Sequence, residues 1–526
     1  MLSRKTFMNR FRREIQHLLP VLLLLALSAT VWGQQDSASG QDQTGQDQTG
    51  QDQTGAPPAA TGPADTNLEN PPLSGLDAPR SEPAFGGRSY LIPGLQFSEG
   101  IDSNANGSIG GGRAAAVSRA LGSLDMQRLW KKYSVALDYV GGGVFYFGPR
   151  IASQSRAYQV HTFAADQRYT WRTGQFAIRD CLDYLPEGTF GMGSFGGAGS
   201  ISDSGEVAAS GASTGMGGTA GCSSGSFGAG QIGSIGFQPR ISNVSVADVT
   251  EQLSPRTSVT LSGGFSVTDF LNKSLTQSQA GFNIINSQQT TAQAGYNRLL
   301  TRKDQLSFIY AFQEFHFPLS QSASLHSHVW SVLYSHRITG RLNFVAGGGP
   351  QVLEIHNPAQ TIFFFGIPIL QIPASTTRRV SANGTVTLGY TVSPRTNGQL
   401  TYRRYFTPGS GFVAGALTDT VRLSVSHTLG RRWTSNVDAG FSHNSALQNS
   451  QTAGINARNY EFWYGGGSLH RRLGVHFSAF VSYQFDDFIA TQCVSSTGPQ
   501  SVCGQSSHRS TATLGINWHP RPIRLD

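Results

Sequence analysis

Apolar and small polar residues alternate along many segments of this chain, and this period of two constrains the fold more than any other feature. In one segment Val386, Leu388 and Tyr390 occupy every second position, with Thr387 and Gly389 between them. Successive side chains of a strand point to opposite faces. Each such segment therefore predicts a strand with one apolar face and one small, polar face.

The alternating segments follow one another in a fixed order: a strand, a short basic turn, a second strand and a long polar connection. Ser393 to Gly398 is one of the short turns. We predict strands at 89–99, 116–129, 133–147, 157–171, 175–185, 241–253, 257–270, 288–299, 305–317, 325–338, 341–355, 378–392, 398–406, 418–429, 432–444, 458–470, 474–486 and 508–519.

Strict alternation of short and long connections is typical of a closed barrel that has lipid outside and water inside. The expected fold is therefore all-β, a transmembrane antiparallel barrel of about 18 strands, within a range of about 16–20. A large soluble β-sandwich or solenoid is the alternative, because its strands also alternate.

The composition agrees with a barrel and excludes a helical membrane protein. Hydrophobic residues make up 38% of the chain, and charged residues only 13%. A barrel strand needs apolar residues at only half of its positions. The net charge of +8 could suggest nucleic acid, but the basic residues lie in the N-terminal segment and singly or in pairs at the short turns. We expect no nucleic-acid partner.

Three regions precede or interrupt the strands. Residues 1–33 have the basic, apolar and small-residue parts of a signal peptide, and the apolar part is short for a membrane anchor. Residues 34–88 carry three copies of Gln-Asp-Gln-Thr-Gly followed by Pro- and Ala-rich sequence, which predicts a disordered periplasmic linker. That linker is a plain tether, or it holds the cell wall or a periplasmic partner.

The third region, 186–240, lies within the barrel domain of residues 89–526 and is a long glycine-rich connection. It either folds inward as a constriction or plug, or shields the outer mouth as an extracellular loop. The predicted location is the bacterial outer membrane, with the signal peptide cleaved.

Four cysteines are candidates for disulfides in an exported protein. Cys493 and Cys503 lie in one long connection and are expected to pair. A bridge between Cys181, near a strand end, and Cys222 would tie the glycine-rich connection to the barrel wall. Metal binding is the weaker interpretation, because neither pair has metal-ligand spacing.

Four further side chains could ligate a metal: Glu314 and His316 on one strand, and His326 and His328 on the next. Polar groups near a loop end are more often rim residues, so no metal site is predicted. We find no local motif for a catalytic residue, a nucleotide or any other cofactor. The chain is therefore expected not to be an enzyme.

Charged residues in register with small polar neighbours are the candidates for lining the lumen. They are Asp125, Asp138, Asp166, Arg168, Arg179, Asp183, Arg403, Arg422, Asp438 and Glu461. Charges inside a water-filled barrel determine which solutes pass. The alternative is that they pair across neighbouring strands and only fill the interior.

The opening strand, Gly94 to Asn104, and repeated hairpins such as Tyr390 to Tyr405 resemble bacterial outer-membrane β-barrel porins. The resemblance covers residues 89–519, and it extends more loosely to the barrel porins associated with exopolysaccharide export. Such barrels commonly end on an aromatic residue, whereas here residues 519–526 follow Trp518.

The resemblance implies a passive pore that contacts outer-membrane lipid and passes small polar solutes or saccharides. The alternatives are a structural or surface-interaction barrel without an open pore, and a barrel linked to exopolysaccharide export. The sequence predicts neither the solute nor the oligomeric state.

Overall fold

The computed structural model describes residues 89–105, 112–148, 157–185, 240–271, 286–318, 324–357, 359–364, 367–407, 415–430, 432–447, 457–493 and 506–525. The predicted signal peptide, the linker and most of the glycine-rich connection lie outside these residues. No helix in the described part is long and apolar enough to cross a membrane.

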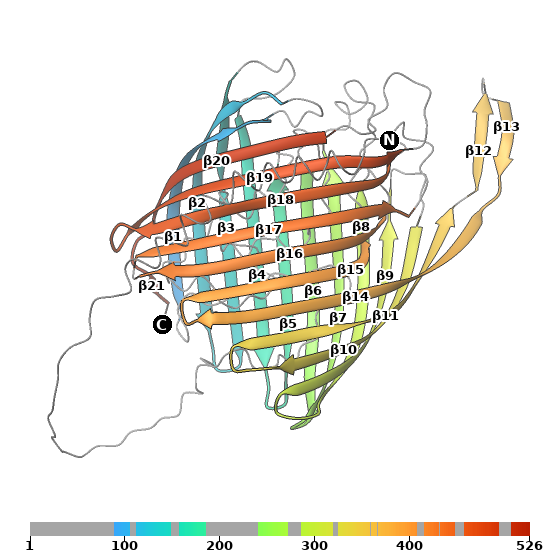
Figure 1. Ribbon diagram of the computed structural model, residues 1–526, viewed down its shortest axis with the longest axis horizontal. Helices are drawn as coiled ribbons and strands as arrows, with labels where there is room; N and C mark the ends of the chain where they lie inside the picture. The colour runs from blue at the N-terminus through green and yellow to red at the C-terminus, as the bar shows by residue number, and fades with distance from the viewer. Residues whose placement is uncertain are drawn as a thin grey trace, which may run out of the picture. The chain divides into compact units, whose positions relative to one another are not determined.

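The described residues form eighteen long strands, drawn in Figure 1. In the first half they are β1 (Tyr90–Asp102), β2 (Ala115–Leu129), β3 (Tyr133–Phe147), β4 (Ala157–Thr170), β5 (Gly174–Leu185), β6 (Arg240–Ser254), β7 (Thr257–Phe270), β8 (Ser287–Leu299) and β9 (Asp304–His316). In the second half they are β10 (Ser324–Arg337), β11 (Leu342–Asn357), β14 (Ser375–Ser393), β15 (Thr396–Thr407), β16 (Ala416–Leu429), β17 (Trp433–Ala446), β18 (Ala457–Arg472), β19 (Phe477–Cys493) and β20 (Ser506–Trp518).

Each long strand pairs antiparallel with the next, and the last closes onto the first. The closing contact aligns Leu95–Asp102 of β1 with Trp518–Thr511 of β20. The chain is therefore a closed antiparallel barrel, as the alternation of strands and turns predicted. Closure satisfies the backbone groups that an open sheet would leave unpaired at its two edges.

Three short strands were not predicted. β12 (Gln360–Phe364) and β13 (Ile367–Ile372) form a hairpin between β11 and β14, and Figure 1 shows it projecting beyond the ends of the neighbouring strands. β21 (Ile523–Arg524) follows Trp518 and pairs with Leu91 and Tyr90 of β1. The C-terminal residues therefore return to the end of β1 that β20 leaves uncovered.

Four of the short turns contain the same kind of hydrogen bond. This bond explains why each of them has Ser or Thr two positions before a basic residue. The first hydroxyl of each turn accepts from the backbone N–H two positions later: Ser254 from Arg256 (3.2 Å), Thr301 from Lys303 (3.1 Å), Thr339 from Arg341 (3.2 Å) and Ser393 from Arg395 (3.2 Å). Such side-chain turns hold the backbone in a tight bend, and the basic side chains are left at the rim.

The two faces of the wall differ as the period of two requires. On the outer face Leu261, Phe265, Leu514 and Ile516 are exposed. Aromatic pairs lie near the short turns, with ring centroids 5.3 Å apart for Trp130 and Tyr133 and 6.0 Å apart for Tyr169 and Trp171. Aromatic residues at this position are typical of a lipid–water boundary.

Polar pairs appear on the outer face toward the long connections. His326 lies 3.3 Å from Glu314, His443 lies 3.4 Å from Glu461, and His508 lies 2.8 Å from Asp487. Between these pairs and the short turns the strands have about the 9–11 residues that a tilted strand needs to cross a bilayer. The outer face thus has an apolar band with polar groups on both sides.

Candidate functional site: the charged inner wall of the barrel

The inner face of the barrel carries charged side chains in three groups, and the first lies on β4 to β6. Asp166 is directly opposite Arg179 in the β4–β5 register. Arg179 makes an ion pair of 2.6 Å with Asp248 of β6, and Arg168 lies 3.6 Å from Asp166. Asp166, Arg179 and Asp248 are almost completely buried. Positive and negative side chains thus alternate along this group, and each buried charge lies beside one of opposite sign, as buried charges require.

The second group lies on β15 to β17. Arg422 Nε donates to Asp438 Oδ2 at 2.9 Å. The carboxylate is fully buried, whereas 30% of the Arg422 side chain is exposed. Arg403 of β15 faces Thr420, two residues from Arg422 along the same face of β16. The guanidinium groups are therefore the exposed members on this side of the interior.

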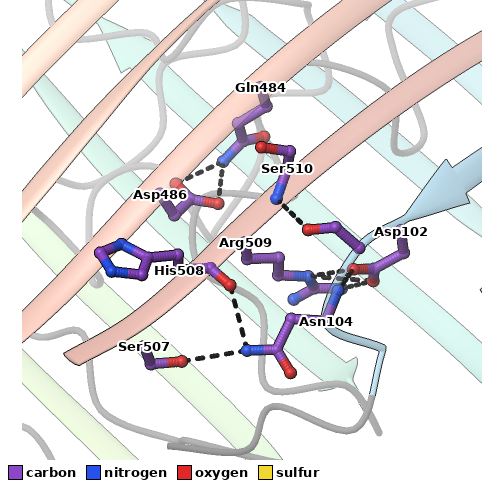
Figure 2. A network of polar contacts seen from close by, with 9 residues as sticks. Asp102, Asn104, Gln484, Asp486, Ser507, His508, Arg509 and Ser510 are labelled. Carbon is purple, nitrogen blue, oxygen red and sulfur yellow. Dashed lines mark hydrogen bonds and ion pairs between the residues drawn. The ribbon is translucent and has the colours of Figure 1, made fainter. Parts of the chain in front are cut away.

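The third group joins the first and last strands at the closing contact (Figure 2). Arg509 Nε donates to both carboxylate oxygens of Asp102, at 3.1 and 2.9 Å, and a second guanidinium nitrogen completes the ion pair. Asn104 extends the group, with Nδ2 donating to Ser507 Oγ at 3.2 Å and to the His508 carbonyl at 3.1 Å.

The same group continues onto β19, where Gln484 Nε2 donates to both carboxylate oxygens of Asp486 at 2.9 and 3.1 Å. Asp102 is fully buried, and Arg509 and Asp486 nearly so. A guanidinium that meets a carboxylate through several donors is the strong form of an ion pair. This pair therefore fastens the two ends of the barrel together.

The remaining predicted residues do not gather into these groups. Asp125 and Asp138 are directly opposite each other on β2 and β3, and both are partly exposed. Two like charges at this spacing repel each other. Asp183 is fully buried on β5, on the same inner face as Arg179.

One predicted lumen residue lies on the other face, so that assignment was wrong. Glu461 is opposite His443 in the β17–β18 register. The neighbouring pair on the same face is Phe441 of β17 and Trp463 of β18. In the β16–β17 register Phe441 is also opposite Val421, whose side chain is exposed outside the barrel. Glu461 therefore belongs to the outer polar pairs.

Several inner charges were missing from the sequence-based set, namely Asp102, Arg119, Asp248, Asp486 and Arg509. Asp248 could have been found, because it shares a face of β6 with Thr250 and alternates with the apolar Ala247 and Val249. The ion pair between Asp102 and Arg509 joins residues 407 positions apart and becomes visible only when the barrel is closed.

The inner face of β8 to β11 is of a different kind. It carries amide and hydroxyl side chains that are almost fully buried: Gln289, Gln293, Asn297, Gln305, Ser307, Gln313, Ser327, Ser331 and Gln351. Gln351 Nε2 donates to Ser327 Oγ at 3.2 Å, and Gln305 Nε2 to Ser307 Oγ at 3.4 Å. The interior thus has a neutral polar sector between charged ones.

The other predicted sites are only partly described. Cys181 is completely buried on β5, and Cys493 ends β19. Their proposed partners, Cys222 and Cys503, lie outside the described residues, so both disulfides stay predictions. Glu314, His316, His326 and His328 share the outer face of β9 and β10. Within the described part of the chain, no three His, Cys, Asp or Glu side chains are placed to hold a metal ion.

No protein-family model and no curated protein matches this chain. Among solved structures, OpdK of Pseudomonas aeruginosa with vanillate is similar at a TM-score of 0.37 and 10% identity, over 82% of this chain and 98% of that one. OccAB4 of Acinetobacter baumannii is similar at a TM-score of 0.38 and 8% identity, over 84% of this chain and 100% of that one.

The ferric citrate transporter FecA in its unliganded form is similar at a TM-score of 0.40 and 12% identity, over 84% of this chain. This chain spans 65% of the length of that transporter.

Proposed function

We propose that this protein is a porin-like channel of the bacterial outer membrane that lets small polar solutes or saccharides pass by diffusion. The observation that carries the proposal is the division of side chains between the two faces of one closed wall. Leu261 and Leu514 are exposed on the outside, while Asp166, Arg179 and Asp438 lie on the inside. An apolar outer face suits lipid, and a polar, charged interior suits water and solutes.

The lumen-lining role of the inner charges belongs to the same proposal. Arg403 and Arg422 are partly exposed and face the interior from β15 and β16. Their charges act on passing ions, whereas the nearly buried pair of Arg179 and Asp248 holds the wall together. The exported N-terminal segment and the two disulfides complete the proposal, as does a linker that tethers the barrel or holds a periplasmic partner.

A swelling assay tests the passage of solutes directly. Liposomes that contain the folded protein are diluted into isotonic solutions of sugars of increasing size. We expect rapid swelling with the smallest sugars and a rate that falls as the sugar grows, because a pore excludes by size. Liposomes with heat-unfolded protein are the control, and equal swelling rates with folded and unfolded protein contradict the proposal.

A second candidate function is a barrel without an open pore that presents surface elements to partners. It is favoured by the burial of the inner polar side chains on β9 to β11 and by the projecting hairpin of β12 and β13. No swelling with any sugar, in a protein that is shown to be folded, supports this candidate. No comparison with known proteins supports a link to exopolysaccharide export.

A further inference from the structure

An apolar cluster lies at the end of the barrel with the long connections, between the inner face of β9 to β11 and the ends of β15 to β17. It consists of Phe315, Phe317, Leu325, Leu353, Ile355, Phe406 and Leu447, all between 0% and 5% exposed, with Leu417 packed against them. We call these residues the latch. They come from two parts of the wall: β9 to β11 with the residue that follows β9, and the ends of β15 to β17.

The wall splits between these two parts. β14 pairs with β11 over Ser375–Tyr390. Its pairing with β15, however, covers only Gly384 to Ser393. The first residues of β14 therefore stay with β9 to β11, while β15 continues to Thr407 on a separate course. The last residues of β15, from Tyr405 to Thr407, are therefore not paired with β14.

The faces that meet in the latch show where these strand ends lie. Phe315 and Leu325 belong to the inner face of β9 and β10, because Tyr310 and Trp330 on the alternate positions are exposed outside. Phe406 and Leu417 are opposite each other in the β15–β16 register. They share a face with Val421, which is exposed outside the barrel, so this is the outer face of β15 and β16. Contact between an inner and an outer face requires the ends of β15 to β17 to lie inside the wall of β9 to β11.

Gly415 shows how closely the two parts approach. Its φ of +77° is in the left-handed region that favours glycine. A β-carbon there would collide with Cδ1 of Leu325 and would lie 3.1 Å from Cδ1 of Leu447. The start of β16 therefore packs directly against the latch, at a position where a larger residue would be strained and would displace the Leu325 side chain.

We propose that the ends of β15 to β17 form a gate at the outer mouth of the barrel, and that the latch holds the gate shut. The proposal rests on the proposed channel function. With the latch closed, these strand ends lie inside the wall of β9 to β11 and narrow the mouth, and their inner face carries the hydrogen-bonded Thr407, Thr418 and Asn444. Release of the latch lets the strand ends swing back into line with the wall, along the split between β14 and β15, and widens the mouth.

Single-channel recording in planar bilayers tests the gate. We expect Phe406→Ala combined with Leu325→Ser to raise open probability or conductance several-fold over the unchanged protein. The control is Val117→Ala combined with Val144→Ala, because both side chains are buried in an apolar cluster on adjacent strands β2 and β3 and touch no part of the latch. The control is expected to conduct like the unchanged protein. Heat-modifiable gel mobility shows that each variant is folded.

A cross-link closes the gate in a second variant, Leu325→Cys with Leu447→Cys, through a short bismaleimide. The cross-linked protein is expected to lose conductance that the untreated variant shows. If the unchanged protein conducts and neither the latch variant nor the cross-link alters its conductance, the gate is contradicted and the channel stands. If no folded variant conducts, the proposed channel fails and the gate fails with it.

Discussion

At the scale of single residues, the interior is organised by ion pairs that are buried to different degrees. The pair of Arg509 and Asp102 is almost wholly buried and joins the first and last strands. In the pair of Arg422 and Asp438 the guanidinium is partly exposed to the interior. The first arrangement serves stability, because a buried charge without its partner is costly. The second leaves a positive charge available to a passing solute.

Arg509→Gln is expected to destabilise the barrel by about 3–5 kcal/mol, because it leaves the Asp102 carboxylate buried without its partner. The change is measured as the shift in the free energy of unfolding in urea, with the protein in detergent micelles. Adding Asp102→Asn is expected to restore most of the lost free energy of unfolding, since the double variant no longer buries a lone charge. Equal stability of the single variant and the unchanged protein contradicts the role of the ion pair.

Asp438→Asn is expected to make the pore more selective for anions, because the charge of Arg422 is then no longer balanced. Arg422→Gln is expected to act in the opposite direction. Both changes are read as a shift of the reversal potential under a salt gradient. Glu461→Gln is the matched control, since Glu461 lies on the outer face and should leave the potential unchanged. A shift for Glu461→Gln as large as for Asp438→Asn would refute the assignment of faces.

At the scale of elements, most of the barrel could be predicted because its strands are encoded locally. The period of two gives the faces, and Ser or Thr before a basic residue gives the tight turns. The β12–β13 hairpin could not be predicted from the pattern, because residues 362–370 form an apolar run without a period of two, interrupted by Gly366 and Pro368. Glu461 was assigned to the wrong face. Residues 462 and 463 are both aromatic, so the alternation of apolar and polar residues that identifies the two faces is lost at this point of the strand.

The candidate site was less predictable than the strands for a physical reason. Each strand reveals which residues share a face, but the partner of a charge depends on the register with other strands. Asp166 and Arg179 lie on consecutive strands and were both identified from the pattern. Asp102 and Arg509 meet only because the two ends of the sheet close. Contacts of that kind are properties of the barrel and not of any segment.

The C-terminal extension makes a prediction at the same scale. β21 pairs with Tyr90 and Leu91, and the Leu525 backbone N–H donates to the Ser89 carbonyl at 3.3 Å. Deleting residues 520–526 should leave this edge of β1 uncovered and lower the temperature at which the folded gel band disappears. A deletion variant with the same transition temperature as the full chain would show that β21 does not support closure.

At the scale of the whole molecule, closure is what turns a repeated strand into a compartment with an inside and an outside. The pairing of β1 with β20 leaves the apolar face toward lipid and places the charges of β4 to β6 and of β16 and β17 around one interior. Closed barrels of this strand number leave room for an aqueous channel. The apolar latch then determines how much of that room is open at the outer mouth.

The most direct test of this account is the single-channel conductance of the folded, full-length protein in planar bilayers. The account predicts discrete, reproducible conductance steps whose ion selectivity changes when Arg422 or Asp438 is neutralised. A correctly folded protein that gives no steps, either unchanged or with the latch disrupted, would contradict it.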